Sequence, residues 1–254
     1  MKSNILLLKL CLLGCLSCLL ASCASTPQLA CPSPKSYAPV GAPYARNDLY
    51  HVVAPGETLW RISKMYDVRM DDIMCANRLP RADQLEMGQR LFIPGAAPLK
   101  PVIPLYPSRK WRYIIIHHSA TDEGNALSLF ALHNKRGWEG LGYHFVINNG
   151  TAGKKEGQIE TSPRWLHQRD GAHCKASEMN KKGIGICLVG NYSEDRVSQE
   201  QMDSLMYLIG VLKDYYNIPA QNIMGHGMVS GAATECPGLN FPWKEFKRRL
   251  RELR

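Results

Sequence analysis

A chain of 254 residues is long enough for one catalytic domain of ordinary size plus a small second module. Its formal charge of +9 is compatible with nucleic acid, an anionic membrane or an acidic polymer, and charge alone does not choose among them. Much of the excess lies at the C-terminal end, without the series of stacking aromatic side chains that single-strand binders place between their charges. We therefore expect no nucleic-acid partner.

The first 22 residues have the pattern of a targeting segment, which is not part of the fold. Lys2 and Lys9 make its start positive, and the apolar run over residues 10–20 is far shorter than the roughly 20 residues that span a bilayer. The tetrapeptide Leu20-Ala21-Ser22-Cys23 then resembles the lipobox of bacterial lipoproteins.

That resemblance implies cleavage before Cys23 and a lipid on its sulfur, which would anchor the mature chain in the cell envelope. Ala24 stands where an Asp would retain such a protein at the inner membrane, so the resemblance favours the outer membrane, facing the periplasm. A cut before Cys15 would leave almost no apolar core. A plain cleaved signal peptide with an incidental Cys23 is the alternative.

Five cysteines remain in the mature chain besides Cys23. An odd number in an oxidising compartment indicates that at least one thiol is occupied otherwise than in a disulfide. These five are Cys31, Cys75, Cys174, Cys187 and Cys236.

Two proline-rich stretches, residues 23–49 and 95–108, divide the mature chain. Proline-rich segments act as extended, semi-rigid spacers, so we expect two linkers around two independently folded units. The units are a small one over residues 50–94 and a larger one over residues 109–254.

The small unit has a strand-helix-helix-strand pattern. A strand begins at His51, helical spacing follows over residues 59–66 and after Asp71, and a last strand over residues 88–93 is expected to end at Pro94. The wording HVVAPGETLWRIS, DDIMCANRL and LEMGQRLFIPG resembles the lysin motif, LysM, over residues 50–94.

LysM modules bind N-acetylglucosamine-containing glycans, so the resemblance implies peptidoglycan as a partner. It places the sugar beside the first turn, at Gly56, Glu57, Thr58 and Leu59. The alternative for single positions is structural: Leu59 in the core and Gly56 as a turn residue.

The larger unit alternates strands and helices, which indicates an α/β class with a mixed central sheet flanked by helices. Ser198 and Gln201 have capping-box spacing at the start of its clearest helix. Strands are expected over residues 111–117, 142–147 and 183–190, and helices over residues 126–136, 198–216 and 242–253.

His and Cys residues in this unit have the chemistry of a metal site. His117 and His118 end a strand, His226 lies between two glycines, and Cys236 follows ten residues later. Three protein ligands with an open fourth position are typical of catalytic zinc. Strand alternation points His117 and His118 to opposite faces, so one of them is expected to face a metal. A lone histidine is also often a satisfied core residue.

Five blocks in order resemble the type 2 N-acetylmuramoyl-L-alanine amidases, a family that includes an amidase-type bacteriophage lysozyme and the peptidoglycan recognition proteins. The blocks lie within residues 108–250 and read IIIHHSAT, HNKRGWEGLGYHFVINNGT, GAHCKASEMN, IGICLVGNY and GHGMVSGAATECPG. The resemblance implies zinc (Zn²⁺) bound by His117, His226 and Cys236. His118 would then pack or hydrogen-bond behind the site.

The same resemblance implies roles for the residues around the metal. Tyr143 and Thr234 match catalytic residues, expected to hydrogen-bond the developing oxyanion, and His173 matches a histidine that lines the substrate cleft. The implied reaction is cleavage, by zinc-activated water, of the amide between N-acetylmuramic acid and L-alanine of the stem peptide.

The general base stays open. Related anhydromuropeptide amidases carry Glu and Asp where this chain has Cys187 and Cys236, which argues against a carboxylate base. His133 also matches a family histidine, but its place on a helix indicates a structural role.

Three other functions remain as alternatives: a non-catalytic binding protein of this fold, a hydrolase that cuts within the stem peptide, and a lipoprotein that tethers envelope to wall. Retention of Cys236, Tyr143 and Thr234 favours the amidase. We expect the chain to act as a monomer.

Overall fold

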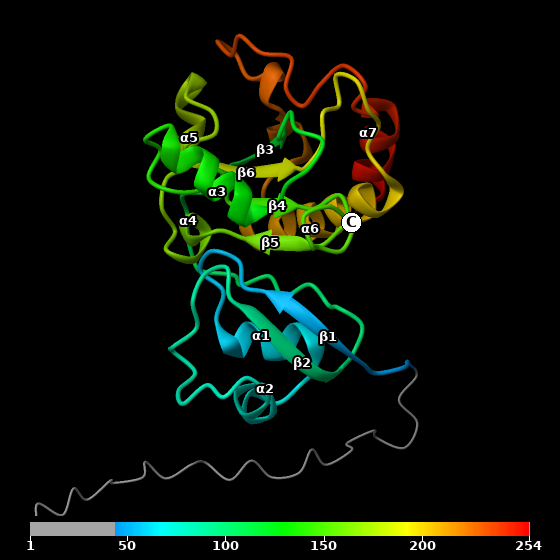
Figure 1. The fold of residues 1–254 in the computed structure, drawn as a ribbon. Helices are drawn as coiled ribbons and strands as arrows, with labels where there is room; N and C mark the ends of the chain where they lie inside the picture. The colour runs from blue at the N-terminus through cyan, green and yellow to red at the C-terminus, as the bar shows by residue number, and fades with distance from the viewer. Residues whose placement is uncertain (1–43, 254) are drawn as a thin grey trace, which may run out of the picture. The chain divides into compact units, whose positions relative to one another are not determined.

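The computed structural model describes residues 44–253 (Figure 1). The targeting segment 1–22, the lipidation site Cys23, Cys31 and most of the linker 23–49 lie outside the described residues and stay predictions. Within residues 44–253, none of the helices has both the length and the apolar character needed to cross a membrane.

The first module consists of two strands and two helices. Strands β1 (Asn47–Val52) and β2 (Arg90–Ala96) pair antiparallel, with α1 (Leu59–Tyr66) and α2 (Met70–Ala76) between them in the chain. The Thr58 hydroxyl accepts a hydrogen bond from the Arg61 N–H and so caps α1. Apolar residues at helical spacing on α1, together with β2, fill a small core, which confirms the predicted strand-helix-helix-strand order.

The predicted end of the last strand at Pro94 is wrong, because β2 continues to Ala96. Leu49 pairs with Ile93 and Asn47 with Ala96, so the register shifts beside the proline. The Gly95 N–H donates instead to the Asp48 carboxylate at 2.8 Å. An irregularity in a two-stranded edge is where a residue without an N–H is tolerated.

The second module is built on a five-stranded sheet in the order β5-β4-β6-β3-β7 (Figure 1). Strand β3 pairs parallel with β6 and β7, β4 pairs parallel with β6, and only the β4–β5 pair is antiparallel. This is the predicted mixed sheet. The strands are β3 (Tyr113–His118), β4 (Phe145–Ile147), β5 (Ile159–Thr161), β6 (Gly183–Leu188) and β7 (Ile223–Gly225).

Helices cover both faces of this sheet. Alternate residues of β6 contact different helices: Ile186 lies in the cluster formed with α6, and Cys187 lies in the cluster formed with α3. The helices are α3 (Ala126–Lys135), α4 (Pro163–Leu166), α5 (Met179–Lys182), α6 (Gln199–Tyr216) and α7 (Trp243–Glu252), with short 3₁₀ turns at Ala176–Glu178, Ala220–Asn222 and His226–Met228.

Two local details differ from the sequence expectation. The Ser198 side chain caps α6 as predicted by accepting from the Gln201 N–H. The reciprocal bond of the predicted capping box does not form, because the Gln201 side chain contacts the Val189 carbonyl and the Tyr192 hydroxyl instead. Strand β4 begins at Phe145 and not at residue 142, so Tyr143 lies in the irregular segment before it.

The segment 95–108 packs against both modules. Leu99 packs on the core of the first module, and Leu105 packs on the core of the second. The Trp165 indole donates to the Pro104 carbonyl at 2.7 Å, which fixes the segment further. The apolar residues between the prolines are partly buried, and the division into two units joined by a linker over residues 95–108 stays a prediction.

A buried ion pair lies beside β5. The Lys154 ammonium is 2.9 Å from the Glu160 carboxylate and donates to the Val52 carbonyl at 2.8 Å, and both side chains are almost fully buried. The other Glu160 oxygen accepts from the Ala126 N–H at the start of α3 and from Asn148. Lys154 thus joins β1 of the first module to the sheet of the second.

Replacing Lys154→Met should lower the free energy of unfolding by about 3 kcal/mol, because it leaves the Glu160 carboxylate buried without its counter-charge. Urea denaturation of the variant and of the parent protein measures the difference. The neighbouring Lys155 is exposed, so Lys155→Met is the matched control and should change stability by less than about 0.5 kcal/mol. Equal small effects for both variants would contradict a structural role for the pair.

Candidate active site

Three potential metal ligands come together at one edge of the sheet. One nitrogen of His117, one of His226 and the Cys236 sulfur all lie within 4.8 Å of one another. Strands β3 and β7 are adjacent and parallel, so His117 near the end of β3 and His226 just after β7 arrive at the same edge. The sequence-predicted set is thus brought together.

A closed loop delivers the third ligand. The Gly227 N–H donates to the Cys236 carbonyl at 2.7 Å, which brings Cys236 back to the end of β7. A side chain at Gly227 would place its Cβ 2.4 Å from the Thr234 carbonyl oxygen, so the loop needs glycine there. The Cys236 sulfur then lies 3.6 Å from His117 Nδ1.

Burial controls protonation in this cluster. It lowers the pKa of His117 well below its usual value, with further lowering from His173 and His226, and it also lowers the pKa of His226. Burial raises the pKa of the Cys236 thiol to about 11, although a hydrogen bond from the His118 main chain acts in the opposite direction. At neutral pH the cluster therefore presents two neutral imidazoles and one thiol.

This donor set fits zinc. Two imidazole nitrogens and one sulfur from a partly buried site are ligands that zinc takes in tetrahedral centres, and a fourth position remains for substrate or water.

Tyr143 lies directly beside the cluster. Its ring centroid is 5.1 Å from that of His117. Burial raises the pKa of its hydroxyl well above 10, and the nearby Cys187 and Cys236 raise it further. The hydroxyl is therefore a permanent hydrogen-bond donor. His133 packs behind it with ring centroids 5.4 Å apart, and His133 Nδ1 accepts the Gly142 N–H at 2.9 Å.

Thr234 lies two residues before the sulfur ligand in the chain. Its side chain is exposed, and its hydroxyl oxygen accepts the Cys236 N–H at 3.2 Å. That contact holds the hydroxyl close to the sulfur ligand and leaves its proton available to a substrate oxygen.

The other two histidines that the sequence assigned near the site, His118 and His173, make different contacts. His118 faces away, and its Nδ1 accepts the Tyr192 N–H at 3.1 Å. His173 is buried, with 8% of its surface exposed, and its Nδ1 lies 3.1 Å from His117 Nε2. Contact between His173 and substrate stays a prediction.

The predicted sugar-binding residues of the first module divide into two kinds. Gly56 and Thr58 are exposed, and Gly56 has the positive φ of 78° that glycine tolerates. Leu59 is buried in the core, which is the structural alternative considered above. The Glu57 carboxylate is buried and accepts from His51 and from the Ala54 N–H, each at 2.7 Å. Sugar binding at these four residues stays a prediction.

Glu57 is ionised in spite of its burial. Desolvation acts to raise its pKa, but the His51 hydrogen bond and charge, with the Lys154 charge and the Ala54 N–H, lower it to about 2. The carboxylate therefore stabilises the first turn.

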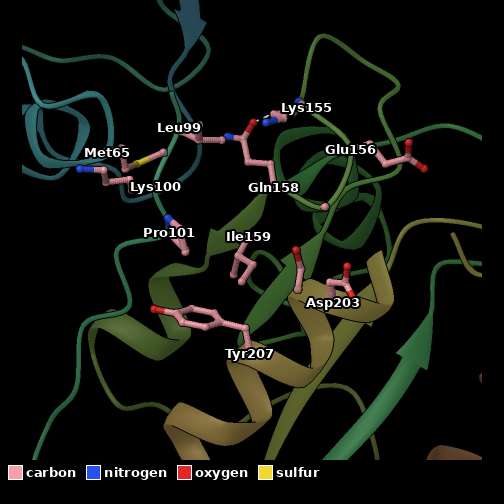
Figure 2. A pocket seen from close by; sticks show the side chains of 12 residues that line it. Met65, Leu99, Lys100, Pro101, Lys155, Glu156, Gln158, Ile159, Asp203 and Tyr207 are labelled. Atoms are coloured by element: carbon pink, nitrogen blue, oxygen red, sulfur yellow. Dashed lines mark hydrogen bonds between the residues drawn. The ribbon is translucent and has the colours of Figure 1, made fainter. Parts of the chain in front are cut away.

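A separate pocket of about 290 Å³ lies apart from this chemistry (Figure 2). Ile159 and Tyr207 line it together with Met65. None of the candidate metal ligands lines it, and we assign no reaction to it.

Sequence reasoning missed the surroundings of His173. Its ring lies against Gly171, Gly185 and His144, none of which was singled out. The signal was available in the alternate glycines of the strand Gly183-Ile184-Gly185, since glycine within a strand often marks a close approach.

Both modules match families of known proteins. Residues 107–239 match the family model of N-acetylmuramoyl-L-alanine amidase, and residues 51–94 match the LysM domain. Peptidoglycan-recognition protein SC1a/b of Drosophila simulans is 32% identical over 145 residues, which cover 53% of this chain and 71% of that protein. The endolysin of Klebsiella phage KP32 is 27% identical over 135 residues, covering 50% and 80%.

Among solved structures, an endolysin N-acetylmuramoyl-L-alanine amidase from Clostridium intestinale is 34% identical. The match covers 56% of this chain and 84% of that one, with a TM-score of 0.47.

Zinc binding should release one proton at neutral pH, because Cys236 alone must lose its proton while both histidines are already neutral. The apparent binding constant should therefore rise about tenfold per pH unit between roughly pH 6.5 and 8, below the raised pKa of the thiol. Competition with a chelator across a pH series measures the slope. A flat dependence, or a hundredfold rise per unit, would contradict these protonation states.

Proposed function

The chain belongs to the N-acetylmuramoyl-L-alanine amidase family and carries a LysM domain, and we propose that it hydrolyses the amide bond between N-acetylmuramic acid and L-alanine in peptidoglycan. One observation carries the proposal: His117, His226 and Cys236 converge within 4.8 Å of one another, with the Tyr143 ring against that of His117. An amide is a poor electrophile, so its hydrolysis needs both a Lewis acid and a donor for the developing oxyanion.

Zinc held by these three residues would supply Lewis acidity to the scissile carbonyl and to the attacking water. The chain's own residues supply the rest. The protonated Tyr143 hydroxyl donates to the oxygen of the scissile carbonyl as negative charge develops there, and the Thr234 hydroxyl donates from the open side. Preorganised donors of this kind each contribute about 10²–10³-fold in rate.

Cys187 is not the general base. It lies in β6 opposite His117, and burial raises its pKa well above 9, with further raising from Cys236. A thiol that stays protonated at neutral pH takes no proton from water.

Catalysis is favoured over binding alone by the completeness of this set. The relatives include peptidoglycan-recognition proteins, whose name states recognition only. A recognition surface needs no sulfur ligand and no buried hydroxyl beside it, whereas this chain retains the thiol, both imidazoles and Tyr143 in one cluster.

The LysM domain supports glycan binding by the same chain, with Thr58 and Gly56 accessible at its first turn. We further propose that a lipid on Cys23 holds the enzyme at the outer membrane facing the periplasm, where peptidoglycan is its substrate. The lipobox-like Leu20-Ala21-Ser22-Cys23 supports this localisation.

Digestion of purified peptidoglycan tests the reaction. Mass analysis should find muramic acid with a free lactyl carboxylate and stem peptides with a new L-alanine amino terminus. Tyr143→Phe should keep the metal and lose about 10²–10³-fold in kcat, because only an oxyanion donor is removed.

New amino termini within the stem peptide would identify a different wall hydrolase. Peptidoglycan binding without release of any fragment would identify a recognition protein. A fully active Tyr143→Phe variant would remove the tyrosine from the mechanism.

Lipid anchoring has its own test. Mass spectrometry of protein from membranes should find a mature chain that begins at an acylated Cys23, since more than one acyl chain is needed for stable attachment. Cys23→Ser should release the protein from the membrane fraction. An unmodified mature chain that starts at another residue would exclude the lipobox.

A further inference from the structure

We propose that His173 is a positioning residue that fixes the His117 ring in the tautomer and rotation in which Nδ1 faces the metal position. The inference rests on the zinc site proposed above. It assigns His173 a task through His117, in addition to any contact with substrate.

A chain of hydrogen bonds sets the protons. His173 Nε2 lies 3.2 Å from the Gly183 carbonyl oxygen, which only accepts, so Nε2 carries the proton. In the neutral ring, His173 Nδ1 is then an acceptor, and it lies 3.1 Å from His117 Nε2. His117 must donate from Nε2, which leaves the lone pair of its Nδ1 free.

The free lone pair is on the ligand side. His117 Nδ1 is the nitrogen that lies 3.6 Å from the Cys236 sulfur. A metal ligand whose other ring nitrogen donates to a fixed acceptor is held in one tautomer and one orientation. The carbonyl of Gly183 in β6 therefore determines, through two imidazole rings, which nitrogen His117 offers to zinc.

The His173 ring lies close to the main chain at Gly171 and Gly185, where a larger residue would clash with it. A Cβ on Gly185 would lie 2.4 Å from His173 Cδ2, and a Cβ on Gly171 would lie 2.3 Å from the same atom. Both distances are far below van der Waals contact. The main chain approaches the ring from two sides, so His173 cannot rotate away from the Gly183 carbonyl.

His144 fills the next position behind the ring without reaching His117. Its centroid is 5.5 Å from that of His173, its Nδ1 accepts the Gly185 N–H at 2.9 Å, and its Nε2 lies 3.2 Å from the Arg169 carbonyl. Both of its ring nitrogens make hydrogen bonds to main-chain groups. His144 is therefore a matched control: a buried histidine in the same cluster with no hydrogen bond to a ligand.

The test compares two replacements of His173. His173→Asn keeps an oxygen acceptor near the position of Nδ1, whereas His173→Leu removes the acceptor and leaves His117 Nε2–H unpaired. The zinc dissociation constant, measured by chelator competition, should rise about 10–100-fold for His173→Leu. It should stay within roughly threefold of the parent protein for His173→Asn and for the control His144→Leu, since both keep an acceptor for His117.

A second variant covers the case in which His173→Leu does not fold. Gly171→Ala changes none of the relay residues but should push the His173 ring away from the Gly183 carbonyl, so its zinc dissociation constant should also rise about 10–100-fold. Visible spectra of the cobalt-substituted proteins should show an altered ligand field in Gly171→Ala and His173→Leu only. Thermal unfolding of the metal-free proteins checks that each variant is folded.

Parent-like zinc affinity in folded His173→Leu or Gly171→Ala would overturn the proposal. Equal weakening by Asn and Leu would overturn it too, because an acceptor would then not be the property that counts. These outcomes are separable from the proposed activity. A protein that binds zinc in the predicted order of variants but cleaves no wall would contradict the amidase function alone.

Discussion

The parallel pairing of β3 with β6 and β7 is the constraint on which the site depends. This register sets His117 opposite Cys187 and brings the end of β7 alongside it, so that His226 follows at the same edge. A slip of one residue would turn His117 to the other face and put His118 in its place. The apolar residues Ile114 and Ile116 secure the register, because they are fully buried against α6 on the face away from the metal position. Packing on one face thus fixes chemistry on the other.

Burial then decides what the gathered side chains can do. Burial lowers the pKa of His117 and lowers that of His173 to about 3, so both imidazoles are neutral at neutral pH. Each ring therefore keeps one unprotonated nitrogen that can accept a hydrogen bond or bind a metal. The same desolvation keeps the Tyr143 hydroxyl protonated. On the proposed function, desolvation would therefore prepare both the acceptors for a cation and the donor for an oxyanion. Within the described residues, the members of this cluster are histidine, cysteine and tyrosine, whose neutral forms tolerate burial better than a carboxylate would.

Much of this was predictable from sequence, for identifiable reasons. The long helix α6 and the buried strands β3 and β6 have clear apolar patterns in the sequence. His117, His226 and Cys236 are far apart in the chain, but each lies in a sequence motif that resembles the amidase family, so they could be assigned to one metal site together. Strands β5 and β7 were not predicted, because three residues are too few to show a period and their pairing depends on the rest of the sheet. The relay through His173 was missed because it depends on a backbone carbonyl and on glycines whose meaning is a close approach in space. Secondary-structure propensity carries no information about such close contacts between distant residues.

The segment 95–108 combines a high proline content with apolar side chains that pack against both modules. Prolines every few residues favour an extended chain, and from composition such a chain is expected to be a spacer. An extended chain also presents alternate side chains to opposite sides, and here Leu99 and Val102 pack with the LysM core while Ile103 and Leu105 pack with the amidase core. Partly buried apolar groups at both ends of the segment reduce its conformational freedom. On the proposed function, Lys154, Trp165 and this segment would limit the reach of the amidase domain, and a glycan bound by the LysM domain would limit where cleavage occurs.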